Sequence, residues 1–422
     1  MKTFNPLNVS SKFAICGLPI RMDTYKYCTF GCKYCFSNNR EIMKFDKNIQ
    51  VANLNWLEKK LDKVLNQHKF DSSNFLDVLI DKGFDFHCGG MSDPFQPCEE
   101  QYKITSQAID ICNAYNRHIL FSTKADTVYE SNIRPDLHTF QLSITNVANR
   151  TDLEPNVPSI DSRLSFYKSL KKDGFKVGIR IQPFIPNISN LEIVKMFEDA
   201  DNFTLEGIKI VPQNKEHKEF ILQTTGLKAT DFTQMGLLNL KPEARLKMYE
   251  PFIEYFREKN IPFSIADNDL HHIGTNKCCC GDNLIHLSTN FNNTAMIKKY
   301  SVDYKIDDIG YELQCDGCAQ CKCNQLFTSN RQEGCITVED FYNKRFDRKS
   351  SPFSPLFLYK PELCNDKAKV CGCCNASITS GYHIIGSQEY FCSVDCLHST
   401  YSREEYMGLC ENNQGYYENS LT

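Results

Sequence analysis

Three cysteines near the start of the chain are spaced closely enough to bind one metal centre. Cys28, Cys32 and Cys35 form the pattern Cys-x3-Cys-x2-Cys. Three thiolates can hold three irons of a 4Fe-4S cluster and leave the fourth iron without a protein ligand. A three-cysteine zinc site is the alternative, although structural zinc normally takes four protein ligands. We therefore predict that these cysteines are cluster ligands and catalytic residues.

An open iron suits S-adenosylmethionine (SAM), which can chelate it through its amino and carboxylate groups. One electron passed to the sulfonium would then start radical chemistry, while the protein sets the potential, the orientation and the exclusion of water. We expect the electron to come from a donor such as flavodoxin or ferredoxin.

A second set of residues could bind this cofactor. Gly89 and Gly90 allow the main chain to approach a ligand closely, so that carbonyl groups can receive the methionyl ammonium. Nearby hydroxyl, carboxylate and ammonium groups can bind the rest of the molecule. The predicted cofactor-binding residues are Tyr34, Gly89, Gly90, Ser92, Asp93, Lys124, Ser143 and Arg180. Taken singly, each has a simpler explanation, because Gly-Gly pairs are usually turns and exposed lysines are usually solvated.

At these residues the sequence resembles the radical SAM superfamily, including the aromatic Tyr34 before the third cysteine. Within it, the chain is similar to the spore photoproduct lyase and DNA-repair-photolyase-like branch over about residues 20 to 215. The patches that carry the likeness are Gly89 to Pro97, Phe121 to Lys124, Phe140 to Ile144, and Leu153-Glu154-Pro155 followed by Arg163-Leu164. The resemblance implies that Ser92, Lys124 and Ser143 contact SAM. We expect Glu154 and Arg163 to form a structural ion pair at a helix start.

The chain departs from spore photoproduct lyase at Met91. In that enzyme a cysteine at this place returns a hydrogen atom to the product radical, and a thioether has no S–H bond to donate. Cys88 and Cys98 could substitute only if the loop presents them differently. We expect both, like Cys16 and Cys112, to be small buried hydrophobic residues.

Alternating secondary structure must position these residues. From about residue 13 to residue 267, short apolar runs alternate with longer amphipathic stretches, which is typical of βα units. The predicted strands are Asp85–Gly89, His118–Thr123, Thr139–Thr145, Lys176–Pro183, Gly207–Val211 and Pro262–Ala266, and the predicted helices are Asn55–His68, Tyr102–Tyr115, Ser162–Lys172, Leu191–Ala200 and Pro242–Lys259. The fold class is therefore α/β, with about six parallel strands in a partial or full (βα) barrel over residues 1–270. The site should lie on loops at the carboxyl ends of the strands.

Composition narrows the class of protein. The 422 residues exceed one typical domain, and 48 Lys plus Arg against 52 Asp plus Glu give no global positive field for nucleic acid. No apolar run is long enough for a membrane span, so we expect a cytoplasmic protein without a membrane partner. The 22 cysteines lie in tight pairs and triplets, which in a cytosolic chain favours metal ligation over disulfides.

A Cys-rich extension over residues 271–348 follows the barrel. It contains Cys278-Cys279-Cys280 and then a ferredoxin-like Cys-x2-Cys-x2-Cys run, with Cys335 beyond. The predicted metal ligands are Cys280, Cys315, Cys318, Cys321 and Cys323. We predict a second 4Fe-4S cluster here, completed by a remote cysteine. Structural zinc is the alternative, because thiolate spacing does not distinguish the two metals.

The last segment predicts a zinc module. A polar linker over residues 349–369 precedes residues 370–422, in which a Cys-rich knuckle and a second cysteine pair are typical of a treble-clef-like zinc finger. The predicted zinc ligands are Cys371, Cys374, Cys392 and Cys396, with Cys373 as a competitor.

Three functions are consistent with these patterns. The leading hypothesis is a radical SAM enzyme that repairs or modifies a nucleobase in DNA or RNA, where the base must be extruded or single-stranded. The second is a radical SAM enzyme with an auxiliary cluster that modifies a peptide or small metabolite. The third is a non-enzymatic iron-sulfur or zinc protein that senses redox state or binds a partner.

Overall fold

The computed structural model describes residues 2–9, 18–40, 49–69, 75–81, 83–235, 237–267, 270, 273–276 and 278–286, together with four two-residue strands after residue 368. The cysteines at 16, 315, 318, 321, 323, 335, 371, 373, 374, 392 and 396 lie outside the described residues, so the predicted second cluster and zinc module stay predictions.

The chain forms two compact units. The larger holds Met1–Ser10, Ile20–Asp62 and Asp85–His286. The Cys-rich extension predicted from residue 271 therefore begins inside this unit. The smaller holds Ser11–Pro19, Lys63–Phe84 and Leu287–Thr422. Its described elements are α3 (Phe75–Asp81) and two antiparallel pairs, β15 (Lys369–Val370) with β16 (Ser377–Ile378) and β17 (Ile384–Ile385) with β18 (Glu389–Tyr390).

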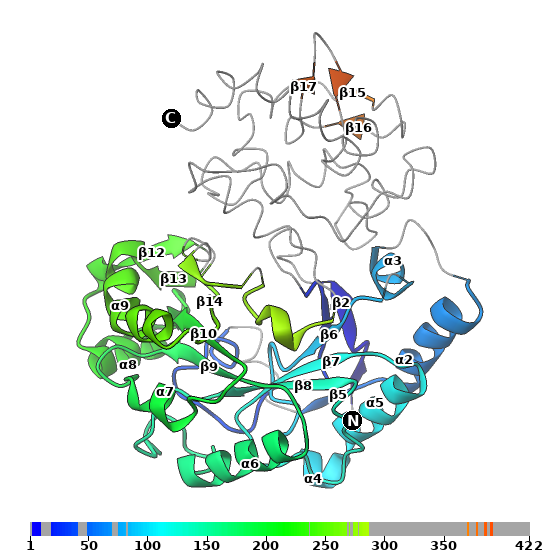
Figure 1. Cartoon of the computed structure of the whole chain (residues 1–422), viewed down its shortest axis with the longest axis horizontal. Coiled ribbons are helices and arrows are strands. Elements are labelled where there is room, and N and C mark those ends of the chain that lie inside the picture. Colours follow the sequence, from blue (N-terminus) through cyan, green and yellow to red (C-terminus); the bar gives the residue numbers. More distant parts are fainter. Residues whose placement is uncertain are drawn as a thin grey trace. The chain divides into compact units, whose positions relative to one another are not determined.

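An eight-stranded sheet is the centre of the larger unit (Figure 1). Its order is β14-β10-β9-β8-β7-β6-β3-β2, and every pair is parallel except β2 with β3. The strands are β2 (Leu7–Val9), β3 (Ile20–Met22), β6 (Phe86–Cys88), β7 (Ile119–Thr123), β8 (His138–Ser143), β9 (Val177–Phe184), β10 (Asn202–Gly207) and β14 (Phe263–Ile265). This arrangement confirms an α/β fold with a large, mostly parallel sheet, in agreement with a partial barrel.

The two faces of the sheet differ in chemistry because side chains alternate along a strand. On the outer face, Phe140 packs against Phe166 of α6, and Phe203 packs against Phe256 of α9. The register places polar residues beside one another on the inner face, and they are Arg21, His87, Ser122, Gln141, Arg180, Thr204 and Ser264. The outer face thus supplies the apolar core, and the inner face is built for polar contacts.

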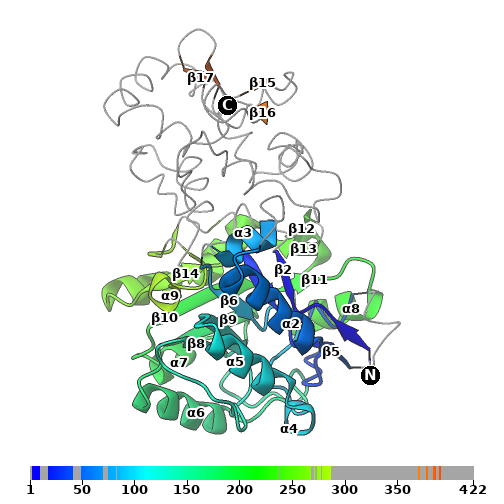
Figure 2. The same ribbon diagram turned by 90° about the vertical axis from the view of Figure 1, so that its right-hand side faces the viewer.

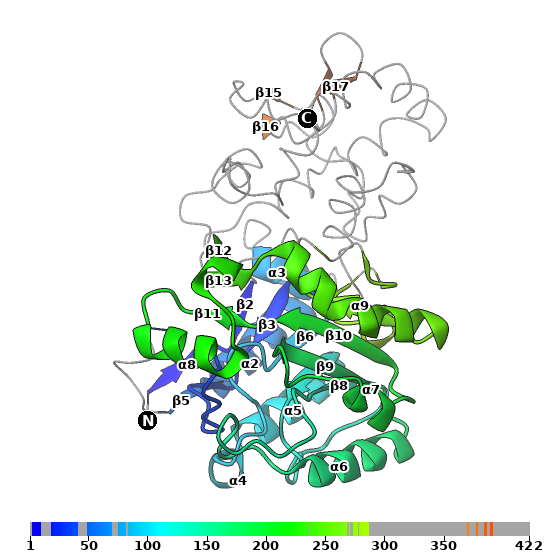
Figure 3. The same cartoon turned by 90° about the vertical axis from the view of Figure 1, so that its left-hand side faces the viewer.

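Helices cover the outer face. Figures 1 and 3 show α5, α6, α7 and α9 along the outer side of the strands. The helices of the larger unit are α2 (Leu54–Leu61), α4 (Glu99–Tyr102), α5 (Ile104–Ala114), α6 (Ile160–Lys172), α7 (Glu192–Met196), α8 (Lys215–Thr225) and α9 (Pro242–Glu258). A π-helical turn, Asp62–Asn66, follows α2, and its residues from Lys63 onward belong to the smaller unit. Among the described helices, none is long and apolar enough to cross a membrane.

Two small sheets flank the large one. One has the order β1 (Thr3–Phe4), β5 (Gln50–Ala52), β4 (Tyr25–Lys26), and the other has the order β11 (Lys209–Ile210), β13 (Leu237–Leu240), β12 (Phe232–Met235). Figure 2 shows β5 and β11 beside the main sheet. The strand β4 is important for the site because the loop that follows it carries Cys28, Cys32 and Cys35.

One predicted strand was misplaced. The sequence predicts a strand over Gly207–Val211, whereas the sheet strand β10 is Asn202–Gly207 and only the short β11 follows. The inner-face positions Asn202, Thr204 and Glu206 are polar and buried, so no apolar run marks this strand. The other five predicted sheet strands overlap β6, β7, β8, β9 and β14.

Candidate active site

One pocket lies at the carboxyl ends of the central strands, with a volume of about 210 Å³. Every predicted cluster and cofactor residue lines it, namely Cys28, Cys32, Cys35, Tyr34, Gly89, Gly90, Ser92, Asp93, Lys124, Ser143 and Arg180. These residues come from five separate parts of the larger unit. The sheet therefore collects them as the sequence pattern predicts, while their roles remain predictions.

Side-chain amides hold the cysteine loop in place. The buried Gln96 accepts the backbone N–H of Thr29 at 2.7 Å and donates to the carbonyl of Tyr27 at 3.2 Å. Asn38 donates to the carbonyl of Cys28 at 2.9 Å. These bonds fix the backbone on both sides of the first cysteine, because each amide satisfies a main-chain group that no strand or helix serves.

Cys32 is buried, and Cys28 and Cys35 are half-buried. Burial raises the pKa of Cys28 and of Cys35, and it raises the pKa of Cys32 to about 12. Thiols in such an environment ionise when a bound cation balances the thiolate charge. Thiolates are soft ligands that favour iron or zinc over magnesium or calcium.

A buried ionic network supports the wall of the pocket. Lys124 donates to Glu154 at 2.9 Å, and its ammonium lies 5.6 Å from the centroid of the Tyr34 ring. The hydroxyl of Tyr34 and that of Thr145, at 2.7 Å, also donate to Glu154. Arg163 lies 3.7 Å from the other carboxylate oxygen, so the expected ion pair is present. Burial alone would raise the pKa of Glu154, but the charges of Lys124 and Arg163 outweigh it and lower that pKa to about 2.

The Gly-Gly turn approaches protein backbone as well as the pocket. Gly89 has φ +104°, and a Cβ there would lie 2.0 Å from the carbonyl oxygen of Ser122 on β7. A Cβ on Gly90 would meet only the side chain of Arg21, at 3.4 Å. Gly89 is thus required by the close packing of the turn on β7, since the left-handed region and the close contact both exclude a side chain.

Asp93 braces the same turn. Its carboxylate accepts the hydroxyl of Thr123 at 2.6 Å and the backbone N–H groups of Lys124 at 2.7 Å and Phe95 at 3.0 Å. Burial raises the pKa of Asp93 to about 6. The hydroxyl of Ser92 donates to the carbonyl of Tyr25 at 2.5 Å. Both predicted acceptors therefore already join the turn to neighbouring strands.

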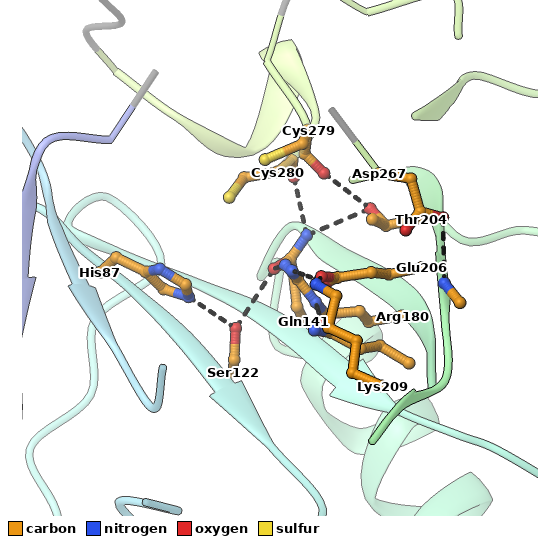
Figure 4. Close-up of polar contacts among 12 residues, drawn as sticks. His87, Ser122, Gln141, Arg180, Thr204, Glu206, Lys209, Asp267, Cys279 and Cys280 are labelled. Atoms are coloured by element: carbon orange, nitrogen blue, oxygen red, sulfur yellow. Dashed lines mark hydrogen bonds and ion pairs between the residues drawn. The ribbon is translucent and has the colours of Figure 1, made fainter. Parts of the chain in front are cut away.

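A polar network forms the floor of the pocket (Figure 4). Arg180 donates to Gln141 at 2.9 Å and lies 3.4 Å from Glu206. Ser122 bonds Gln141 at 3.2 Å and His87 at 2.9 Å. Burial, with the charge of Arg180, lowers the pKa of His87 to about 3, so this imidazole is neutral near pH 7.

Several pocket residues escaped sequence reasoning. His87, Ser122, Gln182 and Lys209 line the pocket in addition to the predicted set. The first three are polar residues at inner-face positions of apolar strands. That alternation is the signal that could have found them, because a side chain two positions from a known inner residue points to the same face.

Met91 and the two cysteines that could replace a hydrogen donor, Cys88 and Cys98, differ in their position relative to the pocket. Met91 lines the pocket. Cys88 and Cys112 are fully buried, as expected. Cys98 is half-buried, so the expectation that it is fully buried is wrong, because it precedes α4 at the edge of the turn. Neither Cys88 nor Cys98 is among the described residues that line the pocket.

A second group of thiols lies on the inner face. The sulfur atoms of Cys278, Cys279 and Cys280 all lie within 4.8 Å of one another. Among the described residues, no other group of three Cys, His, Asp or Glu side chains is found with its ligand atoms so close together. Sequence analysis counted only Cys280 of this group as a ligand.

The similarity of the chain to known proteins is distant. No family model matches the chain. An uncharacterised protein of Methanocaldococcus jannaschii is 23% identical over 235 residues, which cover 53% of this chain and 82% of that protein. A mutant spore photoproduct lyase with bound AdoMet and dinucleoside spore photoproduct aligns with a TM-score of 0.47 and 17% identity, over 61% of this chain and 78% of that chain.

A second neighbour is Streptococcus suis SuiB bound to S-adenosylmethionine. It aligns with a TM-score of 0.38 and 16% identity, over 60% of this chain and 51% of that chain. At TM-scores below 0.5, neither alignment assigns a function by itself. A function must therefore be argued from the residues of the pocket.

Proposed function

We propose that the chain is a radical SAM enzyme. The observation that carries the proposal is that Cys28, Cys32 and Cys35 line one pocket together with every residue predicted to bind the cofactor. These residues lie on loops and strand ends that are far apart in sequence. Their meeting in one place is expected of a binding site and has no explanation in core packing, because most of them are polar.

The donor set fits a 4Fe-4S cluster. The three thiols share a pocket, and no fourth cysteine is among the described residues that line it. Cys28, Cys32 and Cys35 would hold three irons, and SAM would take the fourth. When bound, this pair supplies reductive cleavage of the sulfonium to give a 5′-deoxyadenosyl radical.

The protein's own residues orient and shield the bound group. Lys124 is paired with Glu154 at the wall of the pocket. Its ammonium would therefore bind the methionyl carboxylate of SAM at that wall. Ser143, at the end of β8, and Ser92, after β6, offer hydroxyl oxygens to the pocket, and Asp93 fixes the backbone of Lys124 after β7, the strand between them. Tyr34, which is 4% exposed, excludes water from the side of the third cysteine.

The substrate that we propose is a nucleobase in DNA or RNA, which the enzyme would repair or modify. The support is the resemblance of the motifs and the position of Lys209, a lining residue outside the predicted cofactor set that could meet a carbonyl oxygen of a base. The predicted zinc module would help to position the polymer, and flavodoxin or ferredoxin in the cytoplasm would supply electrons. Retention of DNA or RNA by the oxygen-free protein at low salt tests this part, and no retention would contradict it.

An assay for 5′-deoxyadenosine tests the class of enzyme. The full chain is purified and reconstituted without oxygen, reduced, and given SAM. We expect wild type to form 5′-deoxyadenosine and Cys32→Ala to form none. Cys112→Ala is the matched control, because Cys112 is buried in α5 away from the pocket, and it should retain activity. Equal activity in wild type and Cys32→Ala would contradict the proposal.

A further inference from the structure

The backbone of the Cys278–Cys280 group is fixed to the inner face of the sheet. Successive carbonyl groups accept hydrogen bonds from three strands. Ser264 of β14 donates to Cys278 at 3.1 Å, Thr204 of β10 donates to Cys279 at 3.1 Å, and Gln141 of β8 donates to Cys280 at 2.9 Å. Figure 4 shows the last two of these bonds. The group is therefore held by the most buried part of the fold.

Two glycines make room for this segment. A Cβ on Gly178 of β9 would lie 2.6 Å from Leu284, and one on Gly281, which has φ +93°, would lie 2.7 Å from Asn202. The backbone N–H of Gly281 bonds the carbonyl of Cys278 at 2.9 Å and closes a tight turn. This turn brings three consecutive side chains to one place, which an extended strand would prevent.

The distances between the sulfurs distinguish two kinds of metal centre. Around a single ion with Zn–S bonds of about 2.3 Å in tetrahedral geometry, sulfurs lie about 3.8 Å apart. Thiolates on three different irons of a 4Fe-4S cluster point away from separate corners, and their sulfurs lie about 6 Å apart. The limit of 4.8 Å for Cys278, Cys279 and Cys280 fits the single ion.

Hydrogen bonds around the group also suit thiolate ligands. The backbone N–H of Cys280 donates to the sulfur of Cys278 at 3.4 Å, and Asp282 accepts the backbone N–H of Cys278 at 2.8 Å. The first contact disperses charge on the sulfur, and the second fixes the backbone of the turn that orients the ligands. We propose that Cys278, Cys279 and Cys280 bind a single thiophilic ion, zinc or ferrous iron, next to the floor of the pocket.

Two hydrogen bonds connect the proposed ion site to a residue that lines the pocket. Gln141 bonds the carbonyl of Cys280 on one side and Arg180 on the other, and Arg180 lines the pocket. In Figure 4 the sulfurs of Cys279 and Cys280 lie on the side of His87, another lining residue. The ion thus carries its charge next to the pocket floor. This inference does not depend on the proposed function, because it concerns different ligands.

Metal and sulfide analysis of full-length protein tests the site. We expect Cys279→Ser, and the triple Ser variant at 278, 279 and 280, to lose one zinc or iron per chain with no loss of acid-labile sulfide. Cys112→Ser is the control and should lose none. Unchanged metal content would overturn the proposal, and so would a parallel loss of several irons with sulfide, which would place the triplet in a second cluster.

A measurement on wild type covers the case in which the variants misfold. Native protein is alkylated with and without a chelator, and the peptide carrying the triplet is examined by mass spectrometry. We expect protection of Cys278, Cys279 and Cys280 that the chelator abolishes. Labelling without the chelator, or a peptide lighter by two hydrogens from a disulfide between neighbours, would overturn the inference.

Discussion

The two groups of cysteines in the larger unit differ in how the fold holds them. Cys28, Cys32 and Cys35 lie on a loop that amide side chains fix from outside, and they open onto a pocket. The group Cys278–Cys280 lies on a turn whose carbonyl groups bond three strands. The second arrangement gathers its three sulfurs within 4.8 Å of one another.

This difference distinguishes a cluster site from a single-ion site, which the number of cysteines alone does not distinguish. Three cysteines on a loop that lines a pocket suit a cluster with an open iron and a ligand beside it. Three cysteines whose sulfurs lie close together on the sheet suit a single ion. The substitutions below test the contacts that hold each group, and they run from the largest expected effect to the smallest.

Gly89→Ala should have the largest effect, because the new Cβ would lie 2.0 Å from the carbonyl oxygen of Ser122. We expect a loss of more than about 4 kcal/mol in the free energy of unfolding, which would leave little folded protein. Gly90→Ala is the matched control and should lose less than about 1 kcal/mol, since it meets only a flexible side chain. Chemical denaturation followed by circular dichroism measures both, and similar losses would show that the turn is not packed on β7 as described.

Glu154→Gln should remove the charge that holds Lys124 and Arg163 beside the first group. We expect a loss of about 3 kcal/mol at pH 7 in metal-free protein, because two buried cations lose their partner. Asp152→Asn, in an exposed pair with Arg150, is the control and should change stability by less than about 0.5 kcal/mol. An equal response of the two variants would contradict a buried network.

Acid should remove the contribution of the ionised Glu154 carboxylate to the free energy of unfolding. The pKa of Glu154 falls from 4.5 to about 2 on folding, so its stabilisation is complete above pH 4.5 and is lost as the pH falls through about 2. The difference in stability between wild type and Glu154→Gln should therefore shrink across that interval. Denaturation curves recorded at several pH values check this, and a difference that does not depend on pH would count against the lowered pKa.

Thr204→Val should have the smallest effect and act on the second group. It removes the bond of 3.1 Å to the carbonyl of Cys279, which costs about 1 kcal/mol and should weaken metal retention against a chelator about fivefold. Thr139→Val is the control, because Thr139 bonds the carbonyl of Leu284, beyond the cysteines. Equal metal loss from both variants would mean that this bond does not position the group.

The sequence predicted most of the residues around Cys28, Cys32 and Cys35, and few of those around Cys278–Cys280. The spacing of Cys28, Cys32 and Cys35 and the polar residues after each strand predicted which residues line the pocket, because the carboxyl ends of parallel strands meet at one edge of a sheet. The contact between Gly89 and Ser122 depends on the register of β6 and β7, which no local pattern reports. The meeting of residues 278–280 with β8, β10 and β14 depends on a turn that crosses the sheet, and the polar strand β10 was itself missed.

The most direct test of the central claim is electron paramagnetic resonance of the reduced, oxygen-free protein before and after SAM is added. If the cluster on Cys28, Cys32 and Cys35 has an iron without a protein ligand, its spectrum should change when SAM binds, and Cys32→Ala should give no such change. A spectrum that SAM leaves unaltered, or a colourless N-terminal site filled with zinc, would contradict the account.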